Sequence, residues 1–176
     1  MNRSPSGHPR ARPAPAFRLA ALAAAGVLLG RCTNGGASLG LPALPQAGAA
    51  VSFRNDVQAI VTSHNCASSG CHNDTALGAP MSLETNKSYG TLVNVPSCEA
   101  PGLKRVEPGS SGTSYLVDKV AGTQGAVEGA GGCSAGCLGF TPPGSCGSQM
   151  PLLGSKLTGA EVQVIRDWVD QGAKDN

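Results

Sequence analysis

The stretch Cys66-Ala67-Ser68-Ser69-Gly70-Cys71-His72 decides how the rest of the chain is organised. It places two thiols and an imidazole in one short loop, with only small residues between the two cysteines. The surrounding sequence is poor in large side chains, since it has 25 Gly and 13 Pro among 176 residues and only 3% aromatic residues. Such a chain buries little apolar surface to offset the entropy lost when the backbone is ordered. We therefore expect disulfides, a metal or a covalently held cofactor to stabilise the fold.

Composition and charge exclude several classes of protein. Charged residues make up 14% of the chain and the formal net charge is +2, which argues against a coiled coil and against a nucleic-acid partner. Glycine does not recur at every third position, so a collagen-like chain is excluded too. The sequence contains no Ser-His-Asp set, paired carboxylates or phosphate-binding loop, and we expect the protein not to be an enzyme.

The first 31 residues have the pattern of a secretory signal. Four arginines and no acid precede an apolar run over residues 19–29, which is too short to span a bilayer as a helix. The run ends at Leu28-Leu29-Gly30-Arg31-Cys32, which resembles the processing site of bacterial lipoproteins, where the cysteine becomes the lipidated N-terminus. Arg31 stands where that pattern has Gly, Ala or Ser, and ordinary signal cleavage near Ala37 is the alternative.

This pattern predicts an exported bacterial protein, either periplasmic or attached to a membrane through lipidated Cys32. Residues 32–50 are rich in Gly, Ala and Pro and carry only uncharged side chains after the cysteine, so we expect a flexible tether. The folded domain is then expected over residues 51–176.

Two amphipathic helices are predicted at the two ends of this domain. The first follows Ser52, a good N-cap, and its apolar residues recur at helical spacing: Phe53, Val57, Ile60 and Val61. The last is opened by the capping box of Thr158 and Glu161 and stopped by Gly172. Its apolar face consists of Val162, Ile165, Trp168 and Val169. A third, shorter helix is predicted over residues 114–120, ended by Gly122.

Residues 121–149 contain nine Gly and three Cys, and they are predicted to form a long loop without secondary structure. A loop of this length inside a compact domain needs to be pinned. Outside the stretch at 66–72, four cysteines of the domain are available as pins: Cys98, Cys133, Cys137 and Cys146. Two disulfides are expected in an exported domain, and three connectivities are open.

The spacing of Cys66, Cys71 and His72 is close to that of a haem c attachment motif. Haem c is held by thioethers from two cysteines, and the histidine after the second one ligates the iron; two residues normally separate the cysteines. Here four residues separate them, and their small size lets the loop bulge and still present both thiols. Cys137, in contrast, is followed by Leu138, so we expect one haem only.

The order of five short motifs resembles the exported cytochrome-c-like domains of planctomycetes and myxobacteria. These motifs are Phe53 with Asp56-Val57, Cys66 to His72, Val106-Glu107-Pro108-Gly109 before Ser114-Tyr115-Leu116, Met150-Pro151, and Ile165 to Ala173. The resemblance covers about residues 52–174. It implies an all-α cytochrome c fold of the class I type, with three or more short helices around one covalent haem and long Gly- and Pro-rich loops pinned by disulfides.

The resemblance also implies the roles of individual residues. Cys66 and Cys71 become the thioether anchors, His72 the proximal iron ligand and Met150 the distal one. A methionine thioether is a soft, neutral ligand that stabilises ferrous iron, which suits a one-electron carrier that exchanges electrons with redox partner proteins. An open distal site is the alternative if Met150 does not reach the iron.

Other candidate residues have simpler interpretations. Met81 follows His72 closely and is expected to fill core or haem-edge space. His64 is interpreted as a loop or helix-end histidine rather than a rival distal ligand. The basic side chains of Lys104, Arg105 and Lys119 are interpreted as solvated surface charge, with a haem propionate or an acidic redox partner as the alternative.

Two haem-free alternatives remain open at this point. In one, Cys66, Cys71 and His72, with His64, bind zinc or copper. In the other, Cys66 and Cys71 form a plain disulfide in a structural or interaction lipoprotein.

Overall fold

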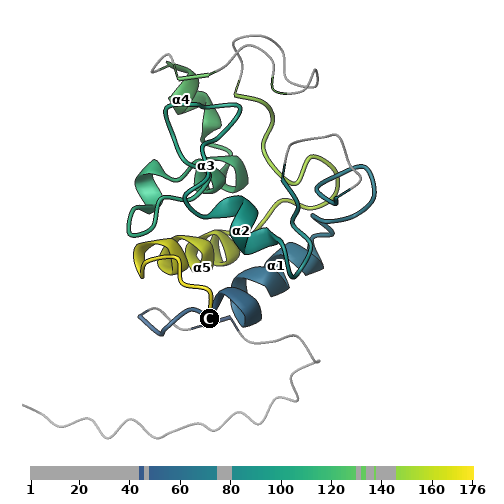
Figure 1. Cartoon of the computed structure of the whole chain (residues 1–176), viewed down its shortest axis with the longest axis vertical. Coiled ribbons are helices and arrows are strands. Elements are labelled where there is room, and N and C mark those ends of the chain that lie inside the picture. Colours follow the sequence, from purple (N-terminus) through teal and green to yellow (C-terminus); the bar gives the residue numbers. More distant parts are fainter. Residues whose placement is uncertain (1–43, 46–47, 75–80, 130–131, 134–136, 138–145) are drawn as a thin grey trace, which may run out of the picture. The chain divides into compact units, whose positions relative to one another are not determined.

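Helices make up the regular structure of the computed structural model, which describes residues 44–45, 48–74, 81–129, 132–133, 137 and 146–176 (Figure 1). Among these residues there is no β-strand, and only isolated bridges occur, such as those of Lys104 with Pro96 and Ser114. The expected all-α class is confirmed at this level. Contacts group residues 41–176 into one unit. The predicted signal segment, Cys32 and most of the tether lie outside the described residues, and the domain boundaries stay predictions.

The first predicted helix is present as two consecutive segments. A π-helical turn, Phe53–Val57, continues into α1, Gln58–Ser63. The Ser52 side chain accepts a hydrogen bond from the Asn55 backbone N–H, as its N-cap role predicts. The predicted apolar face is confirmed, since all four of its side chains are buried: Phe53, Val57, Ile60 and Val61.

The last predicted helix is present as α5, Gly159–Asp170, and is the longest of the described helices. Its capping box is complete, because Thr158 and Glu161 each accept a hydrogen bond from the backbone N–H of the other. Its four predicted core residues are buried, and Val164 joins them. The sequence pattern therefore located both the start and the buried face of this helix.

The two terminal helical segments pack against each other through aromatic rings. The rings of Phe53 and Trp168 lie 5.0 Å apart between centroids, and Tyr89 packs edge-on to Phe53 at 5.3 Å. Trp168 is fully buried, and its indole N–H donates to the carbonyl of Lys174. The blue N-terminal segment and yellow α5 lie side by side in Figure 1. Hydrogen bonds from Ser52 and Phe53 to Asn176 join the segments that flank these helices.

Among the described residues, three short α-helices and one 3-10 turn, Ser111–Thr113, lie between the terminal helices in sequence. Helix α3, Tyr115–Ala121, is the predicted third helix, and Gly122 ends it in the left-handed region at φ +78°. Helix α2, Ser88–Leu92, was not predicted. Helix α4, Gln124–Gly129, lies inside the stretch predicted to lack secondary structure, so that prediction was wrong there. Just after Gly122, the Ala126 N–H donates to the Thr123 carbonyl, so local backbone hydrogen bonding resumes at the start of α4.

The two predicted disulfides are present. They join Cys98 to Cys137 and Cys133 to Cys146, across sequence separations of 39 and 13 residues. The bonds interleave along the chain, so they pin the Gly-rich stretch both to the region of Cys98 and to itself. Cys66 and Cys71 are free thiols. Over the described part of the chain, no helix has the length and hydrophobicity needed to cross a membrane.

Replacing Trp168 by Ala tests whether the aromatic contact supports the fold. The truncation leaves a large cavity at a fully buried site, and removing a buried Trp costs about 3–5 kcal/mol of unfolding free energy. We expect this loss in urea unfolding followed by far-UV circular dichroism. Leu153→Ala is the control, because Leu153 is 80% exposed and its truncation is expected to stay within about 0.5 kcal/mol. Equal stability of the two variants would contradict this account of the core.

Candidate cofactor site

The Cys66 to His72 stretch folds into a closed loop directly after α1. The Cys66 backbone N–H donates to the Val61 carbonyl, five residues earlier, in a bond that closes the C-terminal end of α1 at the first cysteine. The His72 backbone N–H donates to the Cys66 carbonyl at 3.1 Å, so the two ends of the stretch meet. Between them Ser68, Ser69 and Gly70 are exposed. Residues 68–70 therefore bulge into solvent, while the backbones of Cys66 and His72 stay in contact.

Gly70 has a specific part in this bulge. Its φ is +83°, in the region where a Cβ is disfavoured, and the Cys71 N–H donates back to the Ser68 carbonyl to close the turn. Asn65 also has a positive φ, at 53°, just before Cys66. Asparagine tolerates this conformation better than most residues, so the local sequence suits the sharp change of direction between α1 and the loop.

The two thiols are half-buried and unbonded. Cys66 packs against the main hydrophobic core, and the Ser68 hydroxyl lies 3.4 Å from the Cys71 sulfur. Burial, and secondarily the neighbouring Cys71, raises the pKa of the Cys66 thiol to about 11. The thiol of Cys66 is therefore protonated at neutral pH, which lowers its reactivity as a nucleophile.

His72 lies against the protein interior. Its carbonyl accepts a hydrogen bond from the Leu83 N–H at 2.7 Å, which holds the segment that begins at Met81 beside the loop. Its ring nitrogen Nδ1 is buried and has no hydrogen-bond partner among the described residues. A buried polar atom without a partner is costly, and an imidazole nitrogen in this state fits a site that a further group completes.

Charged residues surround this imidazole. Burial lowers the pKa of His72, and the charges of Lys119 and Arg105 lower it further, whereas Glu99 acts in the opposite direction. Lys119 and Arg105 are only 7% and 8% exposed. The interpretation of these two side chains as solvated surface charge was therefore wrong, because each is held inside by hydrogen bonds. Lys104, in contrast, lies partly exposed and pairs with Glu107 at 2.8 Å.

Met150 lies at the C-terminal part of α3 rather than in the loop of His72. Its backbone N–H donates to the Lys119 carbonyl at 2.8 Å, and its side chain is partly buried. The Lys156 ammonium donates to the carbonyls of Gln149 and Pro151, on either side of Met150. The Met150 backbone is therefore hydrogen-bonded to the backbone of Lys119. The charge of the Lys119 side chain is one of those that lower the pKa of His72.

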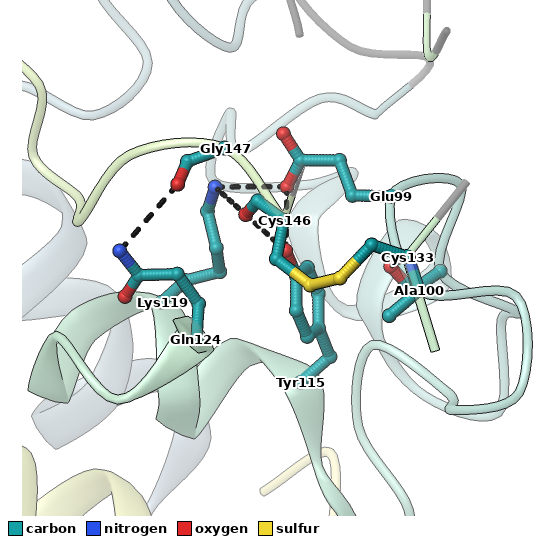
Figure 2. Close-up of a disulfide and its surroundings, with 9 residues drawn as sticks. Glu99, Ala100, Tyr115, Lys119, Gln124, Cys133, Cys146 and Gly147 are labelled. Atoms are coloured by element: carbon teal, nitrogen blue, oxygen red, sulfur yellow. Dashed lines mark hydrogen bonds and ion pairs between the residues drawn. A yellow bond between two sulfur atoms is a disulfide. The ribbon is translucent and has the colours of Figure 1, made fainter. Parts of the chain in front are cut away.

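A polar cluster links Lys119 to the second disulfide (Figure 2). The Lys119 ammonium lies 2.8 Å from a Glu99 carboxylate oxygen and 3.2 Å from the Cys146 carbonyl. The Tyr115 hydroxyl lies 2.6 Å from the same carbonyl oxygen and 3.0 Å from a Glu99 carboxylate oxygen, so its one proton is shared between two acceptors. Burial, together with the Glu99 charge, raises the pKa of Tyr115, so the phenol stays a hydrogen-bond donor. Sequence patterns did not indicate Glu99 or Tyr115, since nothing local distinguishes them from surface polar residues.

His64 and Met81 have the simple roles predicted for them. His64 is the C-cap of α1, with Nδ1 3.2 Å from the Ser155 carbonyl and Nε2 3.0 Å from the Glu161 carboxylate. Both ring nitrogens therefore face protein oxygens rather than an open site. Met81 packs against the main hydrophobic core.

Comparisons with protein-family models, with curated proteins and with solved structures find no match for this chain.

Replacing Glu161 by Gln tests the junction between α1 and α5. Burial opposes ionisation of Glu161, but hydrogen bonds from Thr158 and His64 outweigh it and hold its pKa below 4.5. The carboxylate thus stabilises the fold above its unfolded pKa, and this contribution is lost as the pH falls through the lower, folded pKa. We expect E161Q to lose about 1 kcal/mol near neutral pH, as for a weakened helix cap.

The measurement is urea unfolding of wild type and E161Q across a pH series. The difference in unfolding free energy should shrink as the pH falls below 4.5, because the wild-type carboxyl then becomes neutral as well. The control is Glu84→Gln, which weakens an exposed pair with Lys87. A difference that stays constant down to acidic pH would show that ionised Glu161 does not stabilise the junction.

Proposed function

We propose that this chain is an exported, single-haem c-type cytochrome that carries one electron between redox partner proteins. The observation that carries this proposal is the state of the cysteines. Four of the six cysteines in the described residues form disulfides, whereas Cys66 and Cys71, five positions apart and followed by His72, remain free. Two free thiols next to a histidine, in a chain whose other described cysteines form disulfides, fit covalent attachment of a cofactor.

The arrangement of the loop supports the same proposal. Hydrogen bonding between His72 and Cys66 closes the stretch, so the longer spacing between the cysteines does not separate the histidine from the first thiol. The orphaned, buried Nδ1 of His72 and the partly buried Cys66 and Cys71 fit a group that covers this face of the core. Cys66 and Cys71 would hold haem c by thioethers, and His72 and Met150 would ligate its iron.

The position of the helices also fits. The N-terminal segment carrying Phe53 packs on α5 through Trp168. Cytochromes of the c type pack an N-terminal helix that carries a Phe across a C-terminal helix that carries an aromatic residue, and this contact is similar. When bound, haem c supplies the Fe(II)/Fe(III) couple. The chain's part would be to hold His72 and Met150 as the two iron ligands and to keep water and substrates from the iron, so the protein would act as an electron carrier rather than an enzyme.

The haem-free metal module is less well supported by the side-chain arrangement. Zinc draws all its ligands to about 2.0–2.3 Å from one point. Among the described residues, no group of three or more His, Cys, Asp and Glu side chains converges in that way. His64, the fourth ligand that this alternative needs, is engaged with Ser155 and Glu161. Thioether attachment makes a different demand, because the two sulfurs bond to separate substituents on the porphyrin edge.

The two disulfides suit an oxidising compartment. Together with the signal pattern of residues 1–31, they support export to the periplasm, or membrane attachment through lipidated Cys32. The partners are then redox proteins that meet the domain outside the cytoplasm.

Residue-by-residue thiol mapping tests the proposal against both alternatives. The full chain is exported from a host with haem c maturation machinery, alkylated before and after reduction under denaturing conditions, and digested for mass spectrometry. We expect Cys66 and Cys71 to resist alkylation in both states and to carry the mass of haem. Cys98, Cys133, Cys137 and Cys146 are internal controls, since they should react only after reduction.

The other outcomes contradict the haem proposal in distinguishable ways. Cys66 and Cys71 that react only after reduction indicate a plain disulfide between them. Cys66 and Cys71 that react without reduction, once the chain is denatured, indicate free or metal-bound thiols.

A further inference from the structure

We propose that Lys119 is the positioning residue for Met150, and that it holds both ends of the segment from Cys146 to Met150 against α3. The inference rests on the proposed function, in which Met150 is the distal iron ligand. It goes further by assigning a role to a buried lysine that the sequence pattern did not distinguish from surface charge.

The two ends of the segment are bound by two different groups of the same lysine. The Lys119 ammonium donates to the carbonyl of Cys146 at 3.2 Å. The Lys119 carbonyl accepts from the backbone N–H of Met150 at 2.8 Å. Between these points, the Gln149 amide donates to the Val120 carbonyl at 3.1 Å. The segment from Cys146 to Met150 therefore runs along α3, and the last of these hydrogen bonds fixes the backbone of Met150, the candidate ligand.

The ammonium is itself held in one place. Its side chain is 9% exposed, and Glu99 lies 2.8 Å from it. The Tyr115 hydroxyl lies within hydrogen-bond distance of both Glu99 and the Cys146 carbonyl, so lysine and tyrosine, both on α3, contact the same carbonyl (Figure 2). Cys146 and Tyr115 also belong to one small buried cluster, against which Cys133 packs. A buried charge is costly unless it is paired and hydrogen-bonded, and here the paired ammonium donates to the carbonyl at the start of the Met150 segment.

Gly147 shows how closely the segment approaches the ion pair. A Cβ at this position would lie 2.5 Å from a Glu99 carboxylate oxygen and 2.7 Å from the Lys119 nitrogen. Its φ of +67° also favours glycine. Gly147 therefore lets the backbone pass close to Lys119 and Glu99, where a side chain would clash with them.

Such anchoring matters for a methionine ligand in particular. The thioether is neutral and binds iron without the help of a charge, so ligation depends on how well the backbone presents the sulfur. Partners outside the ligand set orient the ligands and are often as important as the ligands themselves. The two contacts of Lys119 perform this role for the segment that carries Met150.

The test uses the full chain, exported with haem c maturation, as wild type, Lys119→Met and Lys119→Arg. Methionine fills the space of the lysine side chain but cannot donate to Cys146, whereas arginine can. Two readouts are taken: covalent haem after acid-acetone extraction, and the weak far-red absorption band of ferric iron bound to methionine sulfur. We expect K119M to keep covalent haem and to lose at least tenfold in the intensity of the band, and K119R to restore most of it.

Two further variants separate positioning from folding. K119M leaves Glu99 without its lysine, so the double variant Lys119→Met with Glu99→Gln removes both charges, a change that a buried pair often tolerates. We expect this double variant to be as stable as wild type or nearly so, and still to lack the band. Lys87→Met removes a half-exposed lysine paired with Glu84 and should leave the band unchanged.

The outcomes distinguish this inference from the function on which it rests. Covalent haem with a band of full intensity in both K119M and the double variant would overturn the role of Lys119 and leave the cytochrome proposal standing. Absence of covalent haem in the wild type would overturn the cytochrome proposal itself, and with it the assignment of Met150 as a ligand.

Discussion

The contact of Phe53 with Trp168 is the constraint from which the rest of the structure follows. It fixes the N-terminal helical segment against α5 in a chain that has few other large side chains. Because α1 leads directly into Cys66, this packing also sets where the cysteine-histidine loop begins. His64 and Glu161 join the same two helices at the end of α1. The candidate cofactor loop is therefore carried on the best-packed part of the molecule.

The segment that carries the second candidate ligand depends on polar and covalent links. The segment that carries Met150 is tied to α3 by Lys119 and Gln149, and its start is fixed by the Cys133–Cys146 disulfide. Apolar burial thus positions the cysteine-histidine loop, whereas hydrogen bonds, an ion pair and a disulfide hold the segment that carries Met150. The composition predicted that a chain with so few large side chains needs more than apolar burial to hold its fold, and the disulfides and the ion pair meet part of this need. A covalent haem would add the large apolar surface that the side chains lack.

Local signals account for what could be predicted from the sequence. The caps at Ser52 and Thr158, the buried faces of the terminal helices and the glycine that ends α3 are each encoded within a few residues, and the structure has all of them. Helix α4 was missed because two glycines in its six residues give it a low helix propensity. The pairing of four cysteines, and the burial of Lys119 and Arg105, depend on contacts between distant segments, which spacing alone does not specify. The bulge of the motif at 66–72, in contrast, could be predicted from the small size of its residues, and the structure has Ser68, Ser69 and Gly70 exposed.

The central claim is that this fold carries haem covalently at Cys66 and Cys71. The most direct measurement is the absorption spectrum of the exported chain, taken before and after dithionite reduction and again in alkaline pyridine, with the pigment then challenged by acid-acetone extraction. We expect a sharp reduced alpha band and colour that stays with the polypeptide after extraction. A colourless chain from a host that matures other c-type cytochromes, or a pigment that extracts into acetone, would contradict it.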